Sequence, residues 1–335
     1  MSGGFTDLFA VVACGAVVTG AEAVTIPLLR RAAIMDVPGH RSSHTVPTPR
    51  GGGIPIVAGL LVAAGIIGGT NAIVFAFAVA AFGLLGFVED LRGLTAGRRL
   101  ILQTVGGILV AVVLVSNLAS PAWVLVALVV LVAAWITGFV NVFNFMDGVN
   151  GISGAHALIA GVVFAGLGWW RHDGFLLPAG AAVAVSALVF LPWNAGQARV
   201  FLGDAGSYAL GAALAILAAY AVRDGIPVEA ALGPLALYIA DTAWTLQRRI
   251  RAGERWLQAH RTHVYQRWCD AGWSHQRVTV TAAATTVLLS LLGAASLAGD
   301  PALRAAADLV GVAVIVTYLR SPALLARRLV RAEAL

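Results

Sequence analysis

Long apolar runs, each followed by a short polar connection, recur along the chain from end to end. The runs are about 16 to 22 residues long, enough for a helix to cross a hydrocarbon core of roughly 30 Å. We expect about eleven membrane-spanning helices, over residues 8–29, 54–70, 72–88, 101–118, 122–143, 155–170, 175–191, 207–222, 228–246, 278–297 and 305–319. The count can shift by one, because only residues 68–71 separate the second run from the third. The pattern predicts an all-α polytopic membrane protein.

Polar residues gather in alternate connections. The connections richest in Gly, Asn, Asp, Arg and His are 36–53, 89–99, 141–154, 194–207 and 248–277. The helix centres are almost free of charge, whereas a transporter more naturally places polar residues in broken helices near the membrane midplane. No hydrophilic stretch is long enough for a separate domain. We therefore expect residues 1–335 to form one membrane domain with its chemistry in these five segments.

The composition supports a membrane protein. Of the 335 residues, 59% are hydrophobic and 11% are charged, and the mean hydropathy is +0.87. Soluble domains carry roughly 25% charged residues. The first run lacks a basic n-region and holds Glu22, so we expect a helix of the mature protein rather than a cleaved signal peptide. Cys14 and Cys269 fall on opposite sides of this arrangement and are not expected to pair.

All 22 basic residues are arginines, and their placement orients the chain. Basic residues in short connections favour the cytoplasm. With the N-terminus outside and the C-terminus in the cytoplasm, only Arg171, Arg223 and Arg304 fall outside. The net charge of +6 then lines one membrane face, where we expect anionic lipid headgroups and phosphate-bearing substrates as partners, and no nucleic acid. The five polar segments lie on this face.

Three polar side chains follow one another at intervals of three residues after the fifth run. Asn141 and Asn144 lie on one face of a helix, and Asp147 comes directly before Gly148, where the helix is expected to end. The asparagines alone could simply cap a helix C-terminus. Together with the carboxylate they form a candidate site at the membrane surface.

Asp204 lies between two glycines, Gly203 and Gly206, directly before an apolar helix. Its carboxylate could be an ordinary N-cap, which stabilises a helix by about 1 kcal/mol. The alternative is a carboxylate that holds a divalent cation while backbone N–H groups face phosphate oxygens, as helix N-termini favour.

Two adjacent carboxylates, Glu89 and Asp90, end the third run. The dipole at a helix C-terminus disfavours negative charge there. A bound cation, an arginine partner or a catalytic proton transfer would offset this cost. Arg98 and Arg99 follow closely, either as ordinary interfacial residues or as ligands of phosphate.

Two further segments combine histidine with arginine. The first holds His44, Arg50 and three glycines, and is either an anion-binding loop or a stiff linker. The second holds His260, Arg261 and His263, without the third and fourth ligands that zinc requires nearby. Carboxylates and carboxamides suit Mg²⁺, and Arg and His suit phosphate. This combination of groups on one membrane face predicts phosphoryl transfer.

Five motifs, in this order along the chain, resemble those of the polyprenyl-phosphate N-acetylhexosamine-1-phosphate transferases, in glycosyl transferase family 4. They are Arg41-Ser-x-His44-x-x-Pro-Thr-Pro-Arg-Gly-Gly-Gly, the acidic pair, Asn-x-x-Asn-x-x-Asp-Gly-x-x-Gly, Phe-x-Gly-Asp-x-Gly-Ser and His-Arg-x-His-x-Tyr-Gln. The resemblance covers most of the chain. It implies ten or eleven transmembrane helices, dependence on Mg²⁺ (with Mn²⁺ as a substitute) and release of UMP as the lipid phosphate attacks the sugar-linked phosphate.

The resemblance also implies roles for single residues. Asn144 and Asp204 correspond to Mg²⁺ ligands, and Asp90 to a base for the lipid phosphate. The candidate catalytic residues are Glu89, Asp90, Asp147 and His263. The candidate substrate-binding residues are His44, Arg50, Arg99 and Asn141, with Asn150 near the uracil and His260 and Arg261 on the diphosphate.

The chain departs from the family at Glu89, where an aspartate is usual. This puts a covalent role for the first acid in doubt and favours direct attack by the lipid phosphate. The segment His-Arg-Thr-His lacks the run of consecutive histidines that is usual in the peptidoglycan branch. It is closer to the branch that initiates O-antigen and other surface polysaccharides.

The expected protein is a multi-pass enzyme of the inner (plasma) membrane with its active site on the cytoplasmic face. Its expected partners are a UDP-amino sugar, undecaprenyl or another polyprenyl phosphate, and membrane lipid; whether it forms a homodimer stays open. The alternatives are a phospho-N-acetylmuramoyl-pentapeptide transferase, a flippase for lipid-linked sugars, which would release no UMP, a membrane phosphatase and an inactive scaffold.

Overall fold

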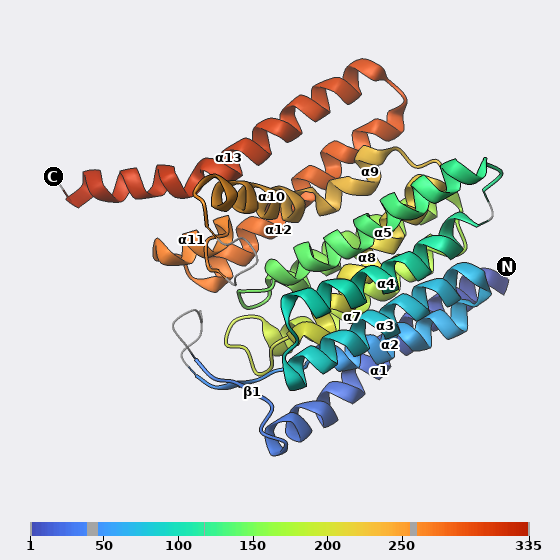
Figure 1. Cartoon of the computed structure of the whole chain (residues 1–335), viewed down its shortest axis with the longest axis horizontal. Coiled ribbons are helices and arrows are strands. Elements are labelled where there is room, and N and C mark those ends of the chain that lie inside the picture. Colours follow the sequence, from blue (N-terminus) through green and yellow to red (C-terminus); the bar gives the residue numbers. More distant parts are fainter. Residues whose placement is uncertain (1, 39–45, 117, 255–259, 334–335) are drawn as a thin grey trace.

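The computed structural model describes residues 2–38, 46–116, 118–254 and 260–333, and these residues are almost entirely helical (Figure 1). The elements, in chain order, are α1 (Ser2–Arg31), β1 (Met35–Asp36), β2 (Thr48–Pro49), α2 (Gly53–Ile67), α3 (Gly69–Arg92), α4 (Ala96–Val115), α5 (Ala122–Phe145), α6 (Ile152–Arg171), α7 (Leu176–Asn194), α8 (Gly203–Arg223), α9 (Val228–Leu232), η1 (Gly233–Leu235), α10 (Ala236–Arg251), α11 (Val264–Asp270), α12 (His275–Ala294), η2 (Ala295–Ala298) and α13 (Pro301–Glu333).

An all-α polytopic membrane protein is confirmed, but the count of about eleven spans is not. Within the described residues, nine helices are long and apolar enough to cross a membrane. Helix α2, expected to be a span, has 15 residues. At about 1.5 Å per residue it is roughly 22 Å long.

The structure departs further from the expected span over 228–246. It is divided into α9, the 3₁₀ turn η1 and α10. Pro234 within η1 has no N–H to continue an α-helical ladder, which accounts for the break. Beyond the break, α10 carries Asp241 inside and three arginines in its last turn, so it is amphipathic rather than apolar.

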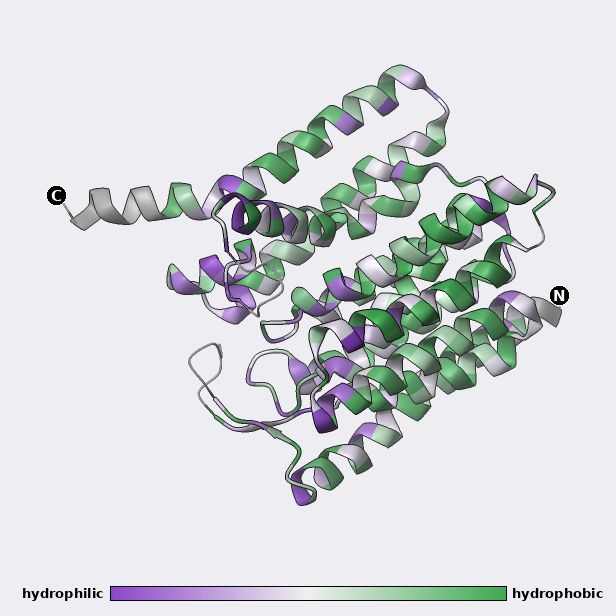
Figure 2. Cartoon of the chain, in the orientation of Figure 1, coloured by the Kyte–Doolittle hydropathy of each residue, from purple (hydrophilic) through white to green (hydrophobic). Residues whose placement is uncertain are grey.

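Helix α8 lies at the centre of the bundle. It packs against α3 and α5, and most of its residues are buried. Its sequence is rich in Ala and Gly, which lets neighbouring backbones approach closely. The outer helices instead expose large apolar side chains, among them Leu84, Trp123 and Leu309. These green helix surfaces in Figure 2 suit contact with lipid.

The two ends of the bundle differ in content. The pocket end, which we define as the end that holds β1, β2 and α11, receives the C-termini of α3, α5 and α7 and the N-termini of α4, α6 and α8 (Figure 1). Purple, hydrophilic positions concentrate there in Figure 2. The opposite end holds the N-terminus and the short connections after α4, α6 and α8. The predicted orientation of these ends relative to the cytoplasm stays a prediction.

Candidate functional site

The site begins with a close approach of two glycine-rich segments. Phe201 N donates to Pro49 O at 2.8 Å, and Gly52 N donates to Phe201 O at 2.9 Å. The N-termini of α2 and α8 then meet so closely that a Cβ on Gly53 would overlap the backbone of Gly206. Glycine at both positions therefore lets β2 and its following turn lie directly against the start of α8.

This approach places Arg50 between two carboxylates. Its Nε lies 2.6 Å from Oδ1 of Asp90, and its Nη2 lies 2.7 Å from Oδ2 of Asp204. Asp90 also accepts hydrogen bonds from the backbone N–H groups of Asp204 (2.9 Å) and Ala205 (3.0 Å). The side chain of Asp90 is only 1% exposed. Asp90 thus caps α8 and fixes Arg50, while Asp204 faces the interior of the site.

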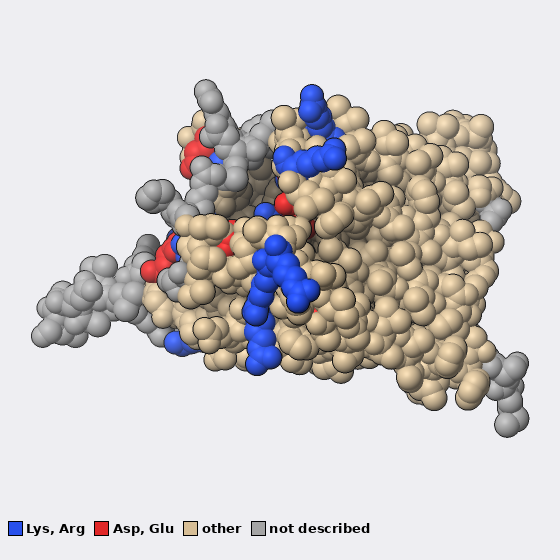
Figure 3. All heavy atoms as spheres, turned by 90° about the horizontal axis from the view of Figure 1, so that it is seen from below, with Lys and Arg blue, Asp and Glu red and all other residues tan. Residues whose placement is uncertain are grey.

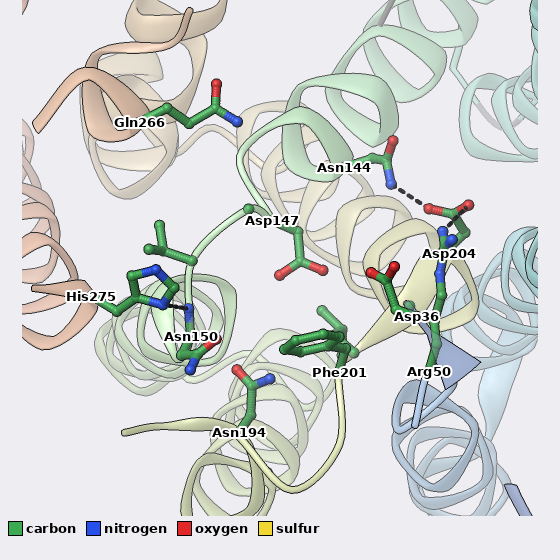
Figure 4. A pocket seen from close by; sticks show the side chains of 14 residues that line it. Asp36, Arg50, Asn144, Asp147, Asn150, Asn194, Phe201, Asp204, Gln266 and His275 are labelled. Atoms are coloured by element: carbon green, nitrogen blue, oxygen red, sulfur yellow. Dashed lines mark hydrogen bonds and ion pairs between the residues drawn. The ribbon is translucent and has the colours of Figure 1, made fainter. Parts of the chain in front are cut away.

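The C-terminus of α5 completes this cluster. Nδ2 of Asn144 donates to Oδ1 of Asp204 at 2.7 Å and to the Ser207 hydroxyl at 3.0 Å. Figure 4 shows Asn144, Asp204 and Arg50 side by side. Residues that are far apart in the sequence, including the two candidate metal ligands, therefore meet at one point.

A cavity of about 270 Å³ opens beside this cluster. Its lining residues are Asp36, Arg50, Asn144, Asp147, Gly148, Val149, Asn150, Asn194, Phe201, Leu202, Gly203, Asp204, Gln266 and His275. In Figure 4 the carboxylate of Asp147 points into the space between Asn144 and Phe201. Burial raises the pKa of Asp147 from 3.8 to about 7. A carboxyl group with this pKa can hold or release a proton near neutral pH.

A second cavity, of about 470 Å³, adjoins the first and shares Asn150, Phe201 and His275 with it. Asn150 is held on both sides: its Nδ2 donates to Gly196 O at 2.6 Å, and its backbone N–H donates to Nδ1 of His275 at 3.4 Å. Phe201 and Asn150 therefore border both cavities. This arrangement suits a planar polar ring.

The segment from 260 to 266 forms another wall. Tyr265 OH donates to Phe145 O at 2.9 Å, which docks α11 against the turn that carries Asp147. Gln266 lines the first cavity. His263 does not line it and is 3% exposed, with Nδ1 3.1 Å from Oδ1 of Asp241.

The other two candidate ligands of the diphosphate lie farther from the cavity. Neither His260 nor Arg261 lines it. Arg261 is paired with Asp270, at 3.2 Å. Burial and the neighbouring His263 lower the pKa of His260 to about 4, so its ring is neutral at physiological pH.

Three other candidate site residues, Glu89, Arg99 and Asn141, contact other residues of the protein. Oε2 of Glu89 accepts from Leu94 N at 2.9 Å, and Oε1 lies 3.9 Å from Nη1 of Arg99. These contacts offset the unfavourable dipole at the end of α3. Asn141 donates to Oε1 of Gln103 at 2.7 Å and does not line the cavity. Roles for these residues in catalysis or substrate binding stay predictions.

His44 and Arg41 lie outside the described residues. Asp36 and His275, which line the cavity, were missed in the sequence because they stand outside the recognised motifs. Asp241 was missed as well, although a single acid within an apolar run is a signal in itself.

Charged side chains gather at this end of the molecule. On the face that Figure 3 shows, blue arginines surround a hollow with red carboxylates, and the remainder of the face is uncharged. Among the described residues, no three His, Cys, Asp or Glu side chains are grouped so that they alone could hold a metal ion. The oxygens of Asp204 and Asn144, one a carboxylate and one a carboxamide, are hard donors of the kind that Mg²⁺ prefers.

Known proteins resemble the chain over most of its length. A sequence profile described as glycosyl transferase family 4 matches residues 72–222. A decaprenyl-phosphate N-acetylglucosaminephosphotransferase of Mycobacterium leprae is 30% identical over 304 residues, which cover 76% of this chain and 74% of that protein. A probable undecaprenyl-phosphate N-acetylglucosaminyl 1-phosphate transferase of Bacillus subtilis is 28% identical, with 76% and 75% covered.

The peptidoglycan branch is similar too. A phospho-N-acetylmuramoyl-pentapeptide-transferase of Bacillus subtilis is 29% identical over 280 residues, which cover 73% of this chain and 82% of that protein. The matched profile residues include Asp90, Asn144, Asp147 and Asp204, which the structure brings together at the pocket end. The chain belongs to glycosyl transferase family 4.

Proposed function

We propose that the protein transfers N-acetylglucosamine 1-phosphate from UDP-N-acetylglucosamine to a polyprenyl phosphate and releases UMP. The observation that carries this proposal is the cluster of Arg50, Asn144 and Asp204 beside the cavity that Asp147 enters. Two relatives, from Mycobacterium leprae and Bacillus subtilis, are named for this sugar phosphate and for a polyprenyl phosphate acceptor.

The cavity offers matching surfaces for the parts of the donor. Phe201 and Asn150, where the two cavities join, would hold the uracil by stacking and by hydrogen bonds from the carboxamide. The diphosphate would then lie near Arg50 and Asp204. The apolar outer surface of the bundle would accommodate the polyprenyl chain, so that the lipid phosphate reaches the site from the membrane.

The proposed reaction is a direct displacement. An oxygen of the lipid phosphate attacks the sugar-linked phosphorus, and the bond from this phosphorus to the bridging oxygen of UMP breaks. Asp147 is better placed than Asp90 to take a proton from the lipid phosphate, because Asp147 enters the cavity and has a pKa of about 7. Both oxygens of Asp90 are occupied by Arg50 and by the first amides of α8.

A divalent cation fits the donor set at this place. Asp204 and Asn144 would hold Mg²⁺, with Mn²⁺ as a substitute, after Arg50 turns from Asp204 toward the substrate and the Asn144 amide turns its oxygen inward. The cation would supply charge that lowers the repulsion between the lipid phosphate and the donor diphosphate. Arg50, thus released, would bind the departing phosphate of UMP.

We place the pocket end on the cytoplasmic side of the inner (plasma) membrane, because the arginines concentrate there. UDP-sugars and other charged nucleotides do not cross a bilayer unaided, which agrees with this side. The product would start a surface polysaccharide. Formation of a homodimer stays a separate proposal.

The direct test is UMP release by the purified, detergent-solubilised protein with Mg²⁺ and undecaprenyl phosphate. The donors to compare are UDP-N-acetylglucosamine, UDP-N-acetylgalactosamine and UDP-N-acetylmuramoyl-pentapeptide. We expect UMP only when lipid phosphate and UDP-N-acetylglucosamine are both present. If, of the three donors, only UDP-N-acetylmuramoyl-pentapeptide supported release, the chain would be assigned to peptidoglycan synthesis. Release without lipid phosphate would indicate a hydrolase.

A further inference from the structure

A buried acid lies outside the cavity and is bonded to the first turn of α11, the helix that carries Gln266. Asp241, on α10, is 0% exposed, and within the described chain its nearest basic side chain is His263. Such a carboxylate is costly to bury unless hydrogen bonds replace the water that it loses. The hydrogen-bond donors around Asp241 therefore indicate its role.

Five donors converge on the two oxygens of Asp241. Oδ1 accepts from the Thr245 hydroxyl at 3.2 Å, from Nδ1 of His263 at 3.1 Å and from Val264 N at 3.0 Å. Oδ2 accepts from Tyr265 N at 3.4 Å and from the Tyr318 hydroxyl at 2.7 Å. These donors come from α10, α11 and α13, so a single carboxylate joins three helices.

The same network sets the hydrogen positions on His263. An ionised carboxylate only accepts, so Nδ1 of His263 carries the hydrogen that faces Asp241. The other ring nitrogen, Nε2, then carries a hydrogen only when the ring is positively charged. The contact with the carboxylate therefore fixes both the tautomer and the orientation of the His263 ring.

The network also fixes the wall of the cavity. The backbone N–H of His263 donates to Oε1 of Gln266 at 3.2 Å. This contact turns the amide NH₂ group of Gln266 away from α11, and a Cβ on Gly148 would lie 3.2 Å from it. Gln266 thus presents hydrogen-bond donors at the edge of the cavity, while Tyr265 docks the same turn onto Phe145.

We propose that Asp241 is a positioning residue for sugar-1-phosphate transfer: it orients the His263 ring and the first turn of α11, so that the amide of Gln266 faces the substrate at the edge of the cavity. The inference rests on the proposed function. It adds a residue that touches no substrate and acts through His263.

The first experiment is a double-mutant cycle on UMP release with Asp241→Asn and His263→Ala. An asparagine keeps the shape but can turn its NH₂ group toward Nδ1 and thereby impose the other tautomer, as in the Asp-to-Asn change of the serine-protease triad. We expect kcat to fall on the order of 100-fold for Asp241→Asn, with KM for UDP-N-acetylglucosamine changed less than about 3-fold. The two losses should not multiply in the double variant.

A matched control is available at the other end of the molecule. Asp173 accepts from two backbone amides at the start of α7, Phe175 N and Leu176 N, and from the Tyr220 hydroxyl at 2.9 Å. It therefore has amide and phenol donors like those of Asp241, without a histidine. Asp173→Asn should lower the melting temperature and leave kcat unchanged.

A milder variant covers the case in which Asp241→Asn does not fold. Tyr318→Phe removes one donor to Oδ2 and leaves the carboxylate and His263 in place. We expect a loss in kcat of roughly 3- to 10-fold that disappears in the His263→Ala background. A wild-type kcat for the folded Asp241→Asn or Tyr318→Phe variant, or losses that multiply with His263→Ala, would overturn the inference. Wild-type protein that releases no UMP from any UDP-sugar would contradict the proposed function instead.

Discussion

The two ends of the bundle use the same residue types in different ways. At the opposite end, Asp173 caps α7 two and three residues later, Asp300 caps α13 in the same way, and the longer-range contact of Glu229 with Arg304 is a single pair. At the pocket end, Asp90 caps α8 across 114 positions of the sequence, and Asp204 pairs with Arg50 across 154. The opposite end uses its carboxylates in caps and single pairs, whereas several distant segments meet at one point of the pocket end.

A cavity alone does not distinguish the two ends. The opposite end has one of about 230 Å³, lined by Arg171, Asp173 and Asp224 among others. There, Asp173 caps the adjacent helix, and Asp224 pairs with the adjacent Arg223. At the pocket end, carboxylates and carboxamides from separate helices face one space. Convergence of several distant segments on one cavity, rather than charge or volume, is therefore the feature that marks a site.

The largest expected effect is the loss of activity in Asp204→Ala. It removes the carboxylate that Arg50 and Asn144 share, and we expect UMP release to fall at least about 1,000-fold. The protein should still be extracted as a folded monodisperse sample, because Asp90 continues to cap α8. Asp173→Ala is the control and should retain activity while losing about 1 kcal/mol of stability. Substantial turnover by Asp204→Ala would remove this residue from the proposed metal site.

The next effect concerns the backbone contact that creates the pocket end. In Gly53→Ala the added methyl would overlap Gly206, so α2 and α8 must separate. We expect a loss of about 1 to 3 kcal/mol in stability, together with most activity. At Gly65, on the same helix, an added methyl would have open space within 4 Å. Gly65→Ala should be neutral or stabilise by up to about 1 kcal/mol, since alanine favours helix. Equal melting temperatures for the two variants would contradict the close approach.

A third test uses pH. The raised pKa of Asp147 means that the base form becomes dominant only above about pH 7. We expect kcat/KM, which reports the free enzyme, to rise with pH through this value and to level off above it. The rise should vanish in Asp147→Asn, which should also lose roughly 100-fold in rate. His260→Ala should keep the rise, because the pKa of His260 is about 4. An unchanged profile in Asp147→Asn would exclude Asp147 as the base.

The same shift has a consequence for stability, with the opposite sign. The folded protein retains a proton on Asp147 that the unfolded chain releases above its ordinary pKa of 3.8. Stability should therefore fall as pH rises from about 4 to about 7. Thermal unfolding of the wild type and of Asp147→Asn across this window would separate this contribution from that of other acids. If the stability of the wild type and of the variant changed with pH in parallel, Asp147 would not titrate in this window.

Much of the bundle follows directly from the sequence, because a long apolar run has only one way to satisfy its backbone in lipid. The nine long apolar helices of the described chain are of this kind. The expected single helix over 228–246 is divided into α9, η1 and α10, since its mean hydropathy concealed a proline at 234 and an acid at 241. Mean hydropathy is an average over a segment, so it does not reveal a single residue, such as Pro234, at which a helix breaks.

Only part of the site was predictable in this way. The motifs identified Asn144 and Asp204, and the structure brings them within a hydrogen bond of each other. Asn141 lies on the same helix face as Asn144 but about 4.5 Å farther along the helix axis, where it bonds to Gln103 instead of lining the cavity. The contact between Asp241 and His263 depends on how α10 and α11 dock, and no local pattern encodes it.

The smallest expected effect lies at the opposite end, in Glu229→Gln. Glu229 pairs with Arg304, whose side chain is 51% exposed. An exposed pair contributes little, so we expect a change below about 1 kcal/mol in stability and none in UMP release. Melting temperature and turnover, measured at low and high salt, provide the check, since salt screens such a pair. A marked loss of turnover in Glu229→Gln would mean that the two ends are coupled, and that charge pairs far from the cavity act on the site.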